Sequence, residues 1–289
     1  MKNILITGGN GQLGQAIRKI AGEFPDFNLI YTDYDTLSIT DAEAVNNYFS
    51  ENKPDACINC AAYTAVDKAE SDEDTAFVLN FQGPLALAEA CANHNTQLVH
   101  ISTDYVFNGN ACVPYKETDE TDPQSVYGSS KMRGEAAVLD VNENNIVVRT
   151  SWLYSEFGVN FAKRMKELMQ ERPELNVVFD QAGTPTYAVD LAKVLLQILQ
   201  QRFEQPAAPT GGVYHYSNEG VTSWFDFAVA IKELTGATTK VSPITSDKYP
   251  TPAKRPAYSV MNKEKIKATF GIEVPYWRDS LAVCLKFIQ

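Results

Sequence analysis

The sequence has little positive charge. Its 25 lysine and arginine residues are outnumbered by 36 aspartate and glutamate residues, which gives a net charge of −11 at pH 7. A field of this sign repels nucleic-acid backbones and anionic lipid surfaces. The first ten residues also lack the basic region and the long apolar segment of an export signal. We therefore expect a cytoplasmic protein that binds neither nucleic acid nor a membrane.

Side chains that form disulfides or bind metals are also scarce. An odd number of cysteines, five, in a chain without an export signal argues against a disulfide framework. Cys57 and Cys60 have the spacing of a redox or zinc motif, but they lie in an apolar run, and no second cysteine pair or histidine cluster accompanies them. Because free cysteine behaves as a small core residue, we interpret the pair as part of a buried strand. We expect no metal site.

Short apolar runs alternate with helical patterns through the first half of the chain. This alternation is typical of parallel strands joined by crossover helices. We expect strands at residues 3–7, 28–32, 56–60, 97–101 and 145–149. Capping sequences predict helices from Thr40 toward Asn52 and from Ser71 toward Asn93, the second with a kink at Pro84. The predicted fold is α/β, a doubly wound parallel sheet of the Rossmann-like type with a smaller α/β C-terminal substrate lobe.

The regular pattern weakens from about residue 150, and prolines gather at 205–209 and 242–256. The 289 residues suffice for a large domain with a smaller one packed on it. We place a dinucleotide-binding domain at residues 1–150, which also receives later segments such as 175–205. Residues 151–289 form mostly a substrate-binding lobe, with helices expected at 223–235, 262–270 and 276–288.

A glycine motif follows the first predicted strand, with Gly8, Gly11 and Gly14 as its spaced members. Glycine permits a tight turn, close approach of the backbone to a pyrophosphate, and packing of the next helix on the strand. Asp33 follows the second strand, where an acid can bond the adenine ribose hydroxyls. No arginine adjoins Asp33 in the sequence, which disfavours the extra phosphate of NADP, but both NADPH and NADH stay possible cofactors.

Tyr127 and Lys131 are four residues apart, which places them on one face of a helix. Ser102 and Thr103 end the fourth predicted strand, on the same carboxyl edge of the sheet as the glycine motif. We expect Thr103 to hydrogen-bond a substrate carbonyl oxygen and Tyr127 to give it a proton. Lys131 would hold the nicotinamide ribose and lower the pKa of the tyrosine from its ordinary value of about 10. No metal is needed for this chemistry.

The glycine motif, the Tyr-x-x-x-Lys pair and the upstream Ser-Thr resemble the extended short-chain dehydrogenase/reductase family. More specific segments, at 61–70, 102–107, 149–152 and 255–256, resemble the dTDP-4-dehydrorhamnose reductases within it, and the likeness spans nearly the whole chain. It implies reduction of the 4-keto group of a nucleotide-linked deoxysugar, dTDP-4-dehydro-L-rhamnose, by NADPH or NADH. Catalysis would fall to Thr103, Tyr127 and Lys131.

The resemblance also assigns binding residues. The cofactor set is Gly8, Gly11, Gln12, Leu13, Gly14, Asp33, Ser38, Ile39, Ala61, Ala62, Thr64, Tyr127 and Lys131. The substrate set is Val66, Thr103, Asp104, Tyr105, Trp152 and Arg255. An indole suits the apolar face of a pyranose, and a guanidinium suits a diphosphate, although taken alone Trp152 also fits a core position and Arg255 a solvated one.

Two departures from the family pattern are visible. Ser38 stands where many members have an acid that contacts the adenine end of the cofactor. Gln15 or Ala16 stands where some members have a glutamate of a magnesium-linked dimer, so we do not predict that dimer. The chain is expected to be a monomer or a homodimer.

Two other functions share these motifs. A nucleotide-sugar epimerase or dehydratase keeps and regenerates its cofactor, and a dehydratase would need a second acid where this chain has Tyr105. A non-catalytic regulatory subunit is the alternative from another class of protein. The intact Thr103, Tyr127 and Lys131 argue against this second alternative, because they indicate that catalysis is retained.

Overall fold

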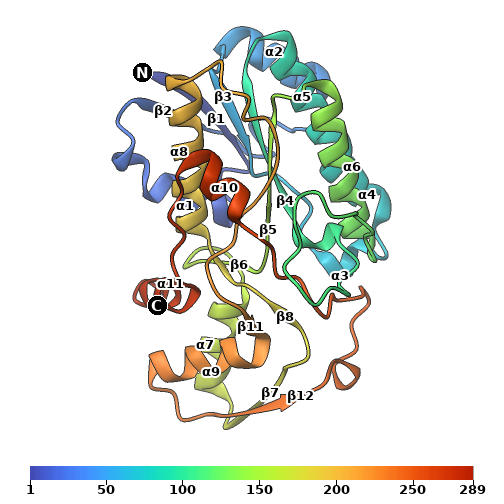
Figure 1. Ribbon diagram of the computed structural model, residues 1–289, viewed down its shortest axis with the longest axis vertical. Helices are drawn as coiled ribbons and strands as arrows, with labels where there is room; N and C mark the ends of the chain where they lie inside the picture. The colour runs from blue at the N-terminus through green and yellow to red at the C-terminus, as the bar shows by residue number, and fades with distance from the viewer. Residues whose placement is uncertain (289) are drawn as a thin grey trace.

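A parallel six-stranded sheet forms the larger part of the molecule (Figure 1). The computed structural model describes residues 1–288. The strand order is β10-β5-β4-β3-β1-β2. The strands are β1 (Lys2–Thr7), β2 (Phe27–Tyr31), β3 (Ala56–Asn59), β4 (Gln97–Thr103), β5 (Ile146–Thr150) and β10 (Gly212–His215). The five predicted strands are present, with ends shifted by one or two residues, and the predicted fold class is confirmed. The order reverses at β1 and β3, where doubly wound sheets bind their ligands.

Alternate residues of the strands enter two different cores. Ile4 and Ile6 of β1 pack with α1 (Gln12–Lys19) and α8 (Ala188–Glu204) on one face of the sheet. Leu5, between them, packs on the other face with α2 (Ala42–Asn52), α5 (Gly83–Asn93) and α6 (Val126–Val141). Because successive side chains of a strand point to opposite faces, a strand buried on both sides reads as a continuous apolar run.

The predicted helix starts need two corrections. Helix α2 is capped by Asp41, whose carboxylate accepts from the amide of Ala44, and not by Thr40. The helix expected from Ser71 to Asn93 is divided into α4 (Glu73–Phe77), the π-helical turn η2 (Val78–Gln82) and α5. Pro84 lies in the first turn of α5, directly after the π turn. A proline is tolerated there because the first amides of a helix have no partner within that helix.

Later segments of the chain return to the sheet. Strand β10 pairs with β5, α8 packs on α1, and α10 (Glu264–Phe270) packs against β10 and α8. The sequence had assigned the helix at 262–270 to the C-terminal lobe, so its place on the sheet is a correction. The division into a dinucleotide-binding domain at residues 1–150 and a mostly substrate-binding lobe at 151–289 stays a prediction.

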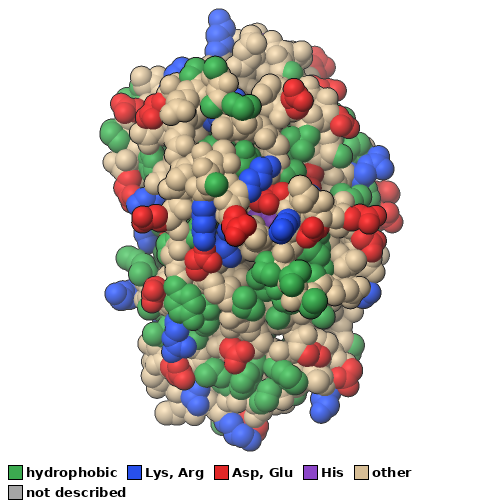
Figure 2. All heavy atoms as spheres, viewed as in Figure 1, with side chains coloured by type: hydrophobic (Ala, Val, Ile, Leu, Met, Phe, Trp, Pro, Cys, Tyr) green, Lys and Arg blue, Asp and Glu red, His purple; other side chains and the backbone are tan. Residues whose placement is uncertain are grey.

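The smaller lobe lies at the carboxyl edge of the sheet (Figure 1). It contains α7 (Phe161–Glu171), α9 (Trp224–Thr235), α11 (Trp277–Leu285) and the short pairs β6 (Leu153–Tyr154) with β9 (Thr186–Tyr187), β7 (Glu174–Val178) with β12 (Lys240–Ile244), and β8 (Ala182–Gly183) with β11 (Thr222–Ser223). Figure 2 shows apolar side chains gathered over the lower half of one face. Phe227, Ile231 and Leu281 form the centre of its core.

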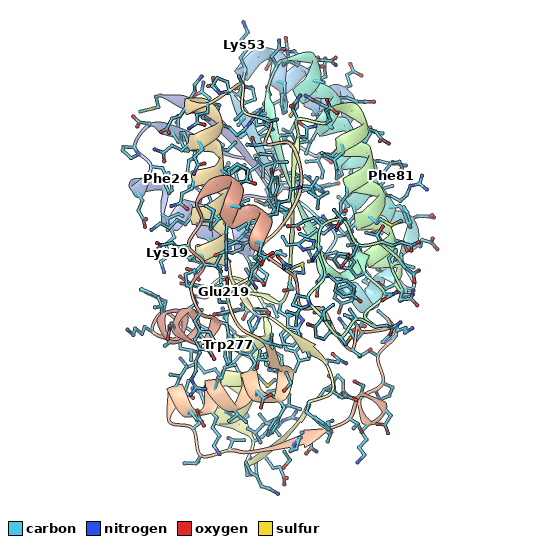
Figure 3. All side chains as sticks on the ribbon, viewed as in Figure 1. Lys19, Phe24, Lys53, Phe81, Glu219 and Trp277 are labelled. Atoms are coloured by element: carbon cyan, nitrogen blue, oxygen red, sulfur yellow. The ribbon has the colours of Figure 1, made fainter. Side chains whose placement is uncertain are left out.

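Glu219 ties the two parts of the molecule together. Its backbone pairs with Pro275 and Trp277, next to α11, and its carboxylate forms ion pairs with Lys263 and Lys267 beside and within α10 (Figure 3). The lobe is thereby anchored to α10, which packs on the sheet. Within residues 1–288, no helix has the length and apolarity needed to span a membrane.

Candidate active site

A pocket of about 840 Å³ lies at the carboxyl edge of the sheet, between the sheet and the smaller lobe. Its size suits a small-molecule ligand. The structure brings almost all of the predicted site residues to its wall: Gly8, Gly11, Gln12, Leu13, Asp33, Ser38, Ile39, Ala61, Ala62, Thr64, Val66, Thr103, Asp104, Tyr105, Tyr127, Lys131, Trp152 and Arg255. Only Gly14 lies behind the wall.

The part of the pocket built from the glycine motif, Asp33 and the end of β3 is called here the glycine half. Gly8 has φ +62°, and a Cβ on it would lie 2.7 Å from the nitrogen of Ala61. A Cβ on Gly14 would lie 2.6 Å from the carbonyl oxygen of Gly8, so Gly14 allows α1 to pack against the turn. No side chain caps the start of α1. Its first amides are therefore available to an anion such as a pyrophosphate.

Asp33 is held at the end of β2 by two backbone amides. Its carboxylate accepts from Asn10 and from Tyr34, each at 2.8 Å. These bonds fix the carboxylate in the pocket wall and leave lone pairs for ribose hydroxyls. Ser38 also lies in the wall, with its hydroxyl 2.9 Å from that of Thr40.

Thr103, Tyr127 and Lys131 come together from β4 and α6. Ser125 caps α6 by accepting from the amide of Gly128 at 3.1 Å. A Cβ on Gly128 would lie 2.3 Å from the carbonyl oxygen of Tyr105, so only glycine lets the helix approach the turn after β4 this closely. Lys131 donates to the carbonyl of Ile101 at 2.6 Å, and Thr103 donates to the Asp104 carboxylate at 2.9 Å.

The pKa of Tyr127 does not shift as the sequence led us to expect. Burial raises it above its ordinary value, and a hydrogen bond with Thr103 only partly offsets the rise. Burial also lowers the pKa of Lys131 to about 8. The charge that most favours the ammonium is that of Glu135, one turn along α6. The expected lowering of the tyrosine pKa by Lys131 is therefore wrong, because burial raises the pKa and the charge of Asp104 adds to the rise.

Asp104 is a buried carboxyl group beside this trio. Burial raises its pKa to about 6, while the hydrogen bond from Thr103 acts in the opposite direction. The Thr103 hydroxyl donates to this carboxyl group at 2.9 Å, so it would have to turn away from Asp104 to donate to a substrate oxygen.

The part of the pocket built from the smaller lobe is called here the aromatic half. Trp152 follows β5 and stacks on Trp224, the first residue of α9, with ring centroids 3.6 Å apart. Arg255 donates to the hydroxyl of Tyr105 at 2.8 Å and to the carboxylate of Asp67 at 2.6 Å. Sequence reasoning missed Trp224 and Asp67. Asp67 stands in one of the family-like segments, whereas Trp224 carries no local signal besides its position after a capping serine.

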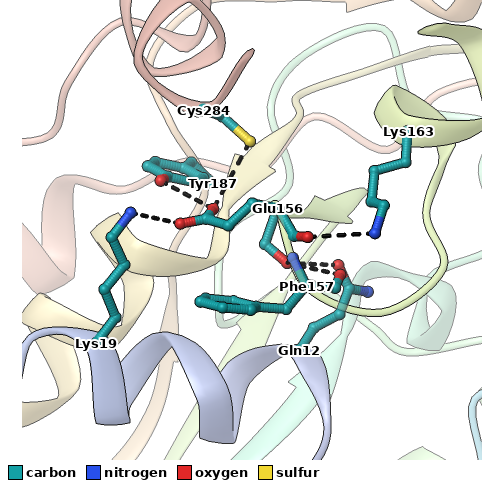
Figure 4. Close-up of polar contacts among 8 residues, drawn as sticks. Gln12, Lys19, Glu156, Phe157, Lys163, Tyr187 and Cys284 are labelled. Atoms are coloured by element: carbon teal, nitrogen blue, oxygen red, sulfur yellow. Dashed lines mark hydrogen bonds and ion pairs between the residues drawn. The ribbon is translucent and has the colours of Figure 1, made fainter. Parts of the chain in front are cut away.

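Hydrogen bonds and an ion pair made by Gln12 and Glu156, called here the polar clasp, join the two halves (Figure 4). The side-chain oxygen of Gln12, in the first turn of α1, accepts from Ser155 and Asn160 at 3.0 Å each. The neighbouring Glu156 pairs with Lys19 of α1 and accepts from the hydroxyl of Tyr187 at 3.0 Å. The side chain of Gln12 is thus directed toward the smaller lobe, and its backbone remains for the cofactor.

The prediction that both cysteines belong to a buried strand is confirmed for Cys57 and wrong for Cys60, because β3 ends at Asn59. Cys57 is buried in β3 and Cys60 follows it, half-buried, in the pocket wall. All five cysteines are free. Over residues 1–288, no group of three or more histidine, cysteine, aspartate or glutamate side chains is arranged to hold a metal ion.

Comparison with known proteins supplies the family. The model described as the RmlD substrate binding domain matches residues 1–289. The chain belongs to this family. A dTDP-4-dehydrorhamnose reductase from Sinorhizobium fredii is 42% identical over 281 residues, which cover 96% of this chain and 94% of that protein.

Solved structures of the same family have the same fold. A dTDP-4-dehydrorhamnose reductase from Clostridium acetobutylicum matches with a TM-score of 0.94 and 44% identity, over 99% of both chains. One from Bacillus anthracis, solved in complex with NADP, matches with a TM-score of 0.92 and 35% identity, also over 99% of both chains. The family resemblance predicted from the motifs is confirmed.

Proposed function

We propose that the protein reduces the 4-keto group of dTDP-4-dehydro-L-rhamnose to give dTDP-L-rhamnose, with hydride from NADPH or NADH. The main support for the proposal is that Thr103, Tyr127 and Lys131 line the same pocket as the glycine half. Relatives that bear the name of this activity match the chain over nearly its full length.

The residues of the glycine half fit a dinucleotide. The backbone of Gly8 and Gly11 and the first amides of α1 would hold the pyrophosphate, and Asp33 the adenine ribose. Ala61 offers a small side chain at the carboxyl edge of β3, where bulk would block the crevice. Lys131 uses one of its three protons on Ile101, which leaves two for the nicotinamide ribose. When bound, the cofactor supplies the hydride.

The remaining groups complete the reduction. A carbonyl carbon that receives a hydride leaves a strongly basic alkoxide, which needs a positioned acid. The raised pKa keeps Tyr127 protonated near neutrality, so its hydroxyl has a proton to give. Thr103 lies next to the same carbonyl position and orients the oxygen. We assign Val66, Asp104, Tyr105, Trp152 and Arg255 to the sugar nucleotide.

The test is a cofactor-oxidation assay with purified protein, NADPH or NADH, and a small panel of nucleotide-linked 4-keto sugars. Stoichiometric loss of the nicotinamide absorbance with the dTDP sugar supports the proposal. Turnover of a nucleotide sugar without net cofactor oxidation would make the protein an epimerase or dehydratase. Cofactor binding without turnover of any sugar would make it a regulatory subunit.

The expected setting follows from the same chemistry. We propose a cytoplasmic enzyme that acts on a soluble nucleotide sugar, either as a monomer or as a homodimer. The acidic net charge and the five free thiols support this setting.

A further inference from the structure

The backbone of Trp152 adopts an unusual conformation. Its φ is +47°, in the left-handed region, which bulky residues rarely occupy and which costs free energy. Both sides of the residue are tied to one segment. Ser151 donates to the carbonyl of Thr184 at 2.7 Å, and the carbonyl of Trp152 accepts from Thr186 at 3.1 Å. These bonds turn the indole toward the pocket.

The stack between Trp152 and Trp224 is a second unusual feature. The rings are nearly parallel, at 8°, with centroids only 3.6 Å apart, so they overlap almost fully. Isolated aromatic pairs prefer an offset or edge-to-face arrangement. The surroundings must therefore hold the two rings in this geometry.

Neighbouring residues hold Trp224 in place. It begins α9 directly after Ser223, whose hydroxyl accepts from the amide of Asp226 at 3.0 Å and donates to the Asp226 carboxylate at 2.6 Å. Phe161 packs beside it, with ring centroids 4.6 Å apart. Trp224 therefore belongs to the core of the smaller lobe on one side and to the pocket wall on the other.

Gly183 provides the remaining space. It pairs with Thr222 in the β8–β11 ladder, and a Cβ on it would lie 2.6 Å from two carbons of the Trp152 indole. The φ of Gly183 lies outside the positive range, so the need for glycine comes from the indole and from the Ser259 hydroxyl, which would lie 2.8 Å from the Cβ, and not from the backbone. The β8–β11 pair thus supports Trp152 through Gly183 and leads directly into Trp224.

The stacked pair faces the reacting groups. Thr150 of β5 pairs in register with Thr103 of β4, and Trp152 follows two residues later. We propose that Trp224 is a positioning residue, which holds the Trp152 indole in place so that the two rings form one rigid floor for the apolar face of the deoxysugar. This inference rests on the proposed function and adds to it a residue that contributes through Trp152.

The main test compares Trp224→Leu with Trp224→Tyr and Trp152→Ala. We expect Trp224→Leu to lower kcat/KM for the sugar nucleotide about tenfold, mostly through KM, because the acid and the cofactor site are untouched. The cofactor Kd should change less than about twofold. Trp224→Tyr, which keeps a flat ring to stack on, should recover most of the loss. Equal losses for Tyr and Leu, or equal weakening of cofactor binding, would overturn the proposal.

A double variant separates positioning from direct contact. If Trp224 acts only through Trp152, the double variant Trp152→Ala with Trp224→Leu should be no worse than Trp152→Ala alone. Losses that multiply would mean that Trp224 touches the sugar itself, and the proposed role would be wrong. Trp277→Phe is the matched control, since Trp277 is a buried indole of the same lobe outside the pocket.

Gly183→Ala keeps the inference testable if Trp224→Leu does not fold. The added methyl group displaces the Trp152 ring while both tryptophans remain, so kcat/KM for the sugar should again fall about tenfold at unchanged cofactor affinity. An unchanged kcat/KM would refute the proposal. If the wild-type protein reduces no 4-keto sugar, the proposed function fails. If the wild type is active and these variants match it, only the present inference fails.

Discussion

The glycine half and the aromatic half of the pocket are built from different parts of the polypeptide. In the glycine half, the backbone forms the surface, and the space left by Gly8 and Gly14 decides its shape. In the aromatic half, side chains form the surface, and segments far apart in the sequence supply Trp152, Trp224 and Arg255. The backbone surface depends on short motifs at the ends of neighbouring strands, whereas the side-chain surface depends on how segments far apart in the sequence pack.

The comparison also explains the clasp. On the proposed function, a cofactor in the glycine half and a sugar in the aromatic half would have to keep a fixed distance for hydride transfer, because small misplacements are costly. Gln12 and Glu156 lie where the two halves meet, and each is bonded across the boundary. The two halves are therefore built from different segments, and these bonds hold them in a fixed position relative to each other.

The largest effect is expected at the reacting centre, between the halves. Tyr127→Phe deletes only the hydroxyl, so turnover should fall by about 10²–10⁴-fold, the usual contribution of a general acid. Cofactor Kd and thermal midpoint should be nearly unchanged. A variant that retains more than about a tenth of wild-type turnover, with chemistry shown to be rate-limiting, would remove Tyr127 from the mechanism.

The next effect tests the backbone character of the glycine half. Gly8→Ala places a Cβ 2.7 Å from the nitrogen of Ala61 at a positive φ. If the strain of about 1–3 kcal/mol falls on the bound state, cofactor affinity should drop by about 5- to 150-fold, measured by titration. Gly22→Ala is the matched control, since nothing lies within 4 Å of its Cβ. If both variants bind the cofactor like the wild type, the glycine half is not shaped by the space at Gly8.

A third prediction concerns pH and the buried carboxyl beside Thr103. The pKa of Asp104 is raised to about 6 in the folded protein, against about 3.9 in an unfolded chain. Folding therefore favours the protonated form, and stability is lost as the pH rises from about 4 to above 6. At pH 7 Asp104→Asn should stabilise the protein by about 2–3 kcal/mol, and at pH 4 by much less.

Chemical denaturation of both proteins at several pH values provides the measurement. A stability difference that does not vary between pH 4 and pH 7 would show that Asp104 ionises normally. Glu117→Gln, at a carboxyl outside the pocket, is a control for the general effect of removing one negative charge.

The smallest effect concerns the choice of cofactor. Because the Asp33 carboxylate lies where a 2′-phosphate would approach, NADH should be used at least comparably with NADPH. Steady-state kcat/KM values for both cofactors provide the measurement. A preference for NADPH beyond about a hundredfold, or about 2.7 kcal/mol, would contradict this view of the site. Asp33→Asn should shift the ratio toward NADPH, while Asp35→Asn, at an exposed neighbour outside the pocket, should not.

The sequence by itself determined the sheet and the glycine half. Apolar runs such as Ile4 to Ile6 are long enough to identify buried strands, and the spacing of Gly8, Gly11 and Gly14 is a local pattern. The same holds for Tyr127 and Lys131, since four residues along a helix return to the same face. Local geometry follows from neighbours in the chain, so these features can be read without the fold.

Only the tertiary structure decided the partners within the aromatic half and the sign of one pKa shift. Trp224 meets Trp152, and Asp67 meets Arg255, across separations in sequence that no local pattern reports. Tyr127 was expected to have a lowered pKa from its charged neighbour, but its burial raises it. Desolvation and stacking depend on every segment that surrounds a side chain, and the chain brings those segments together only by folding.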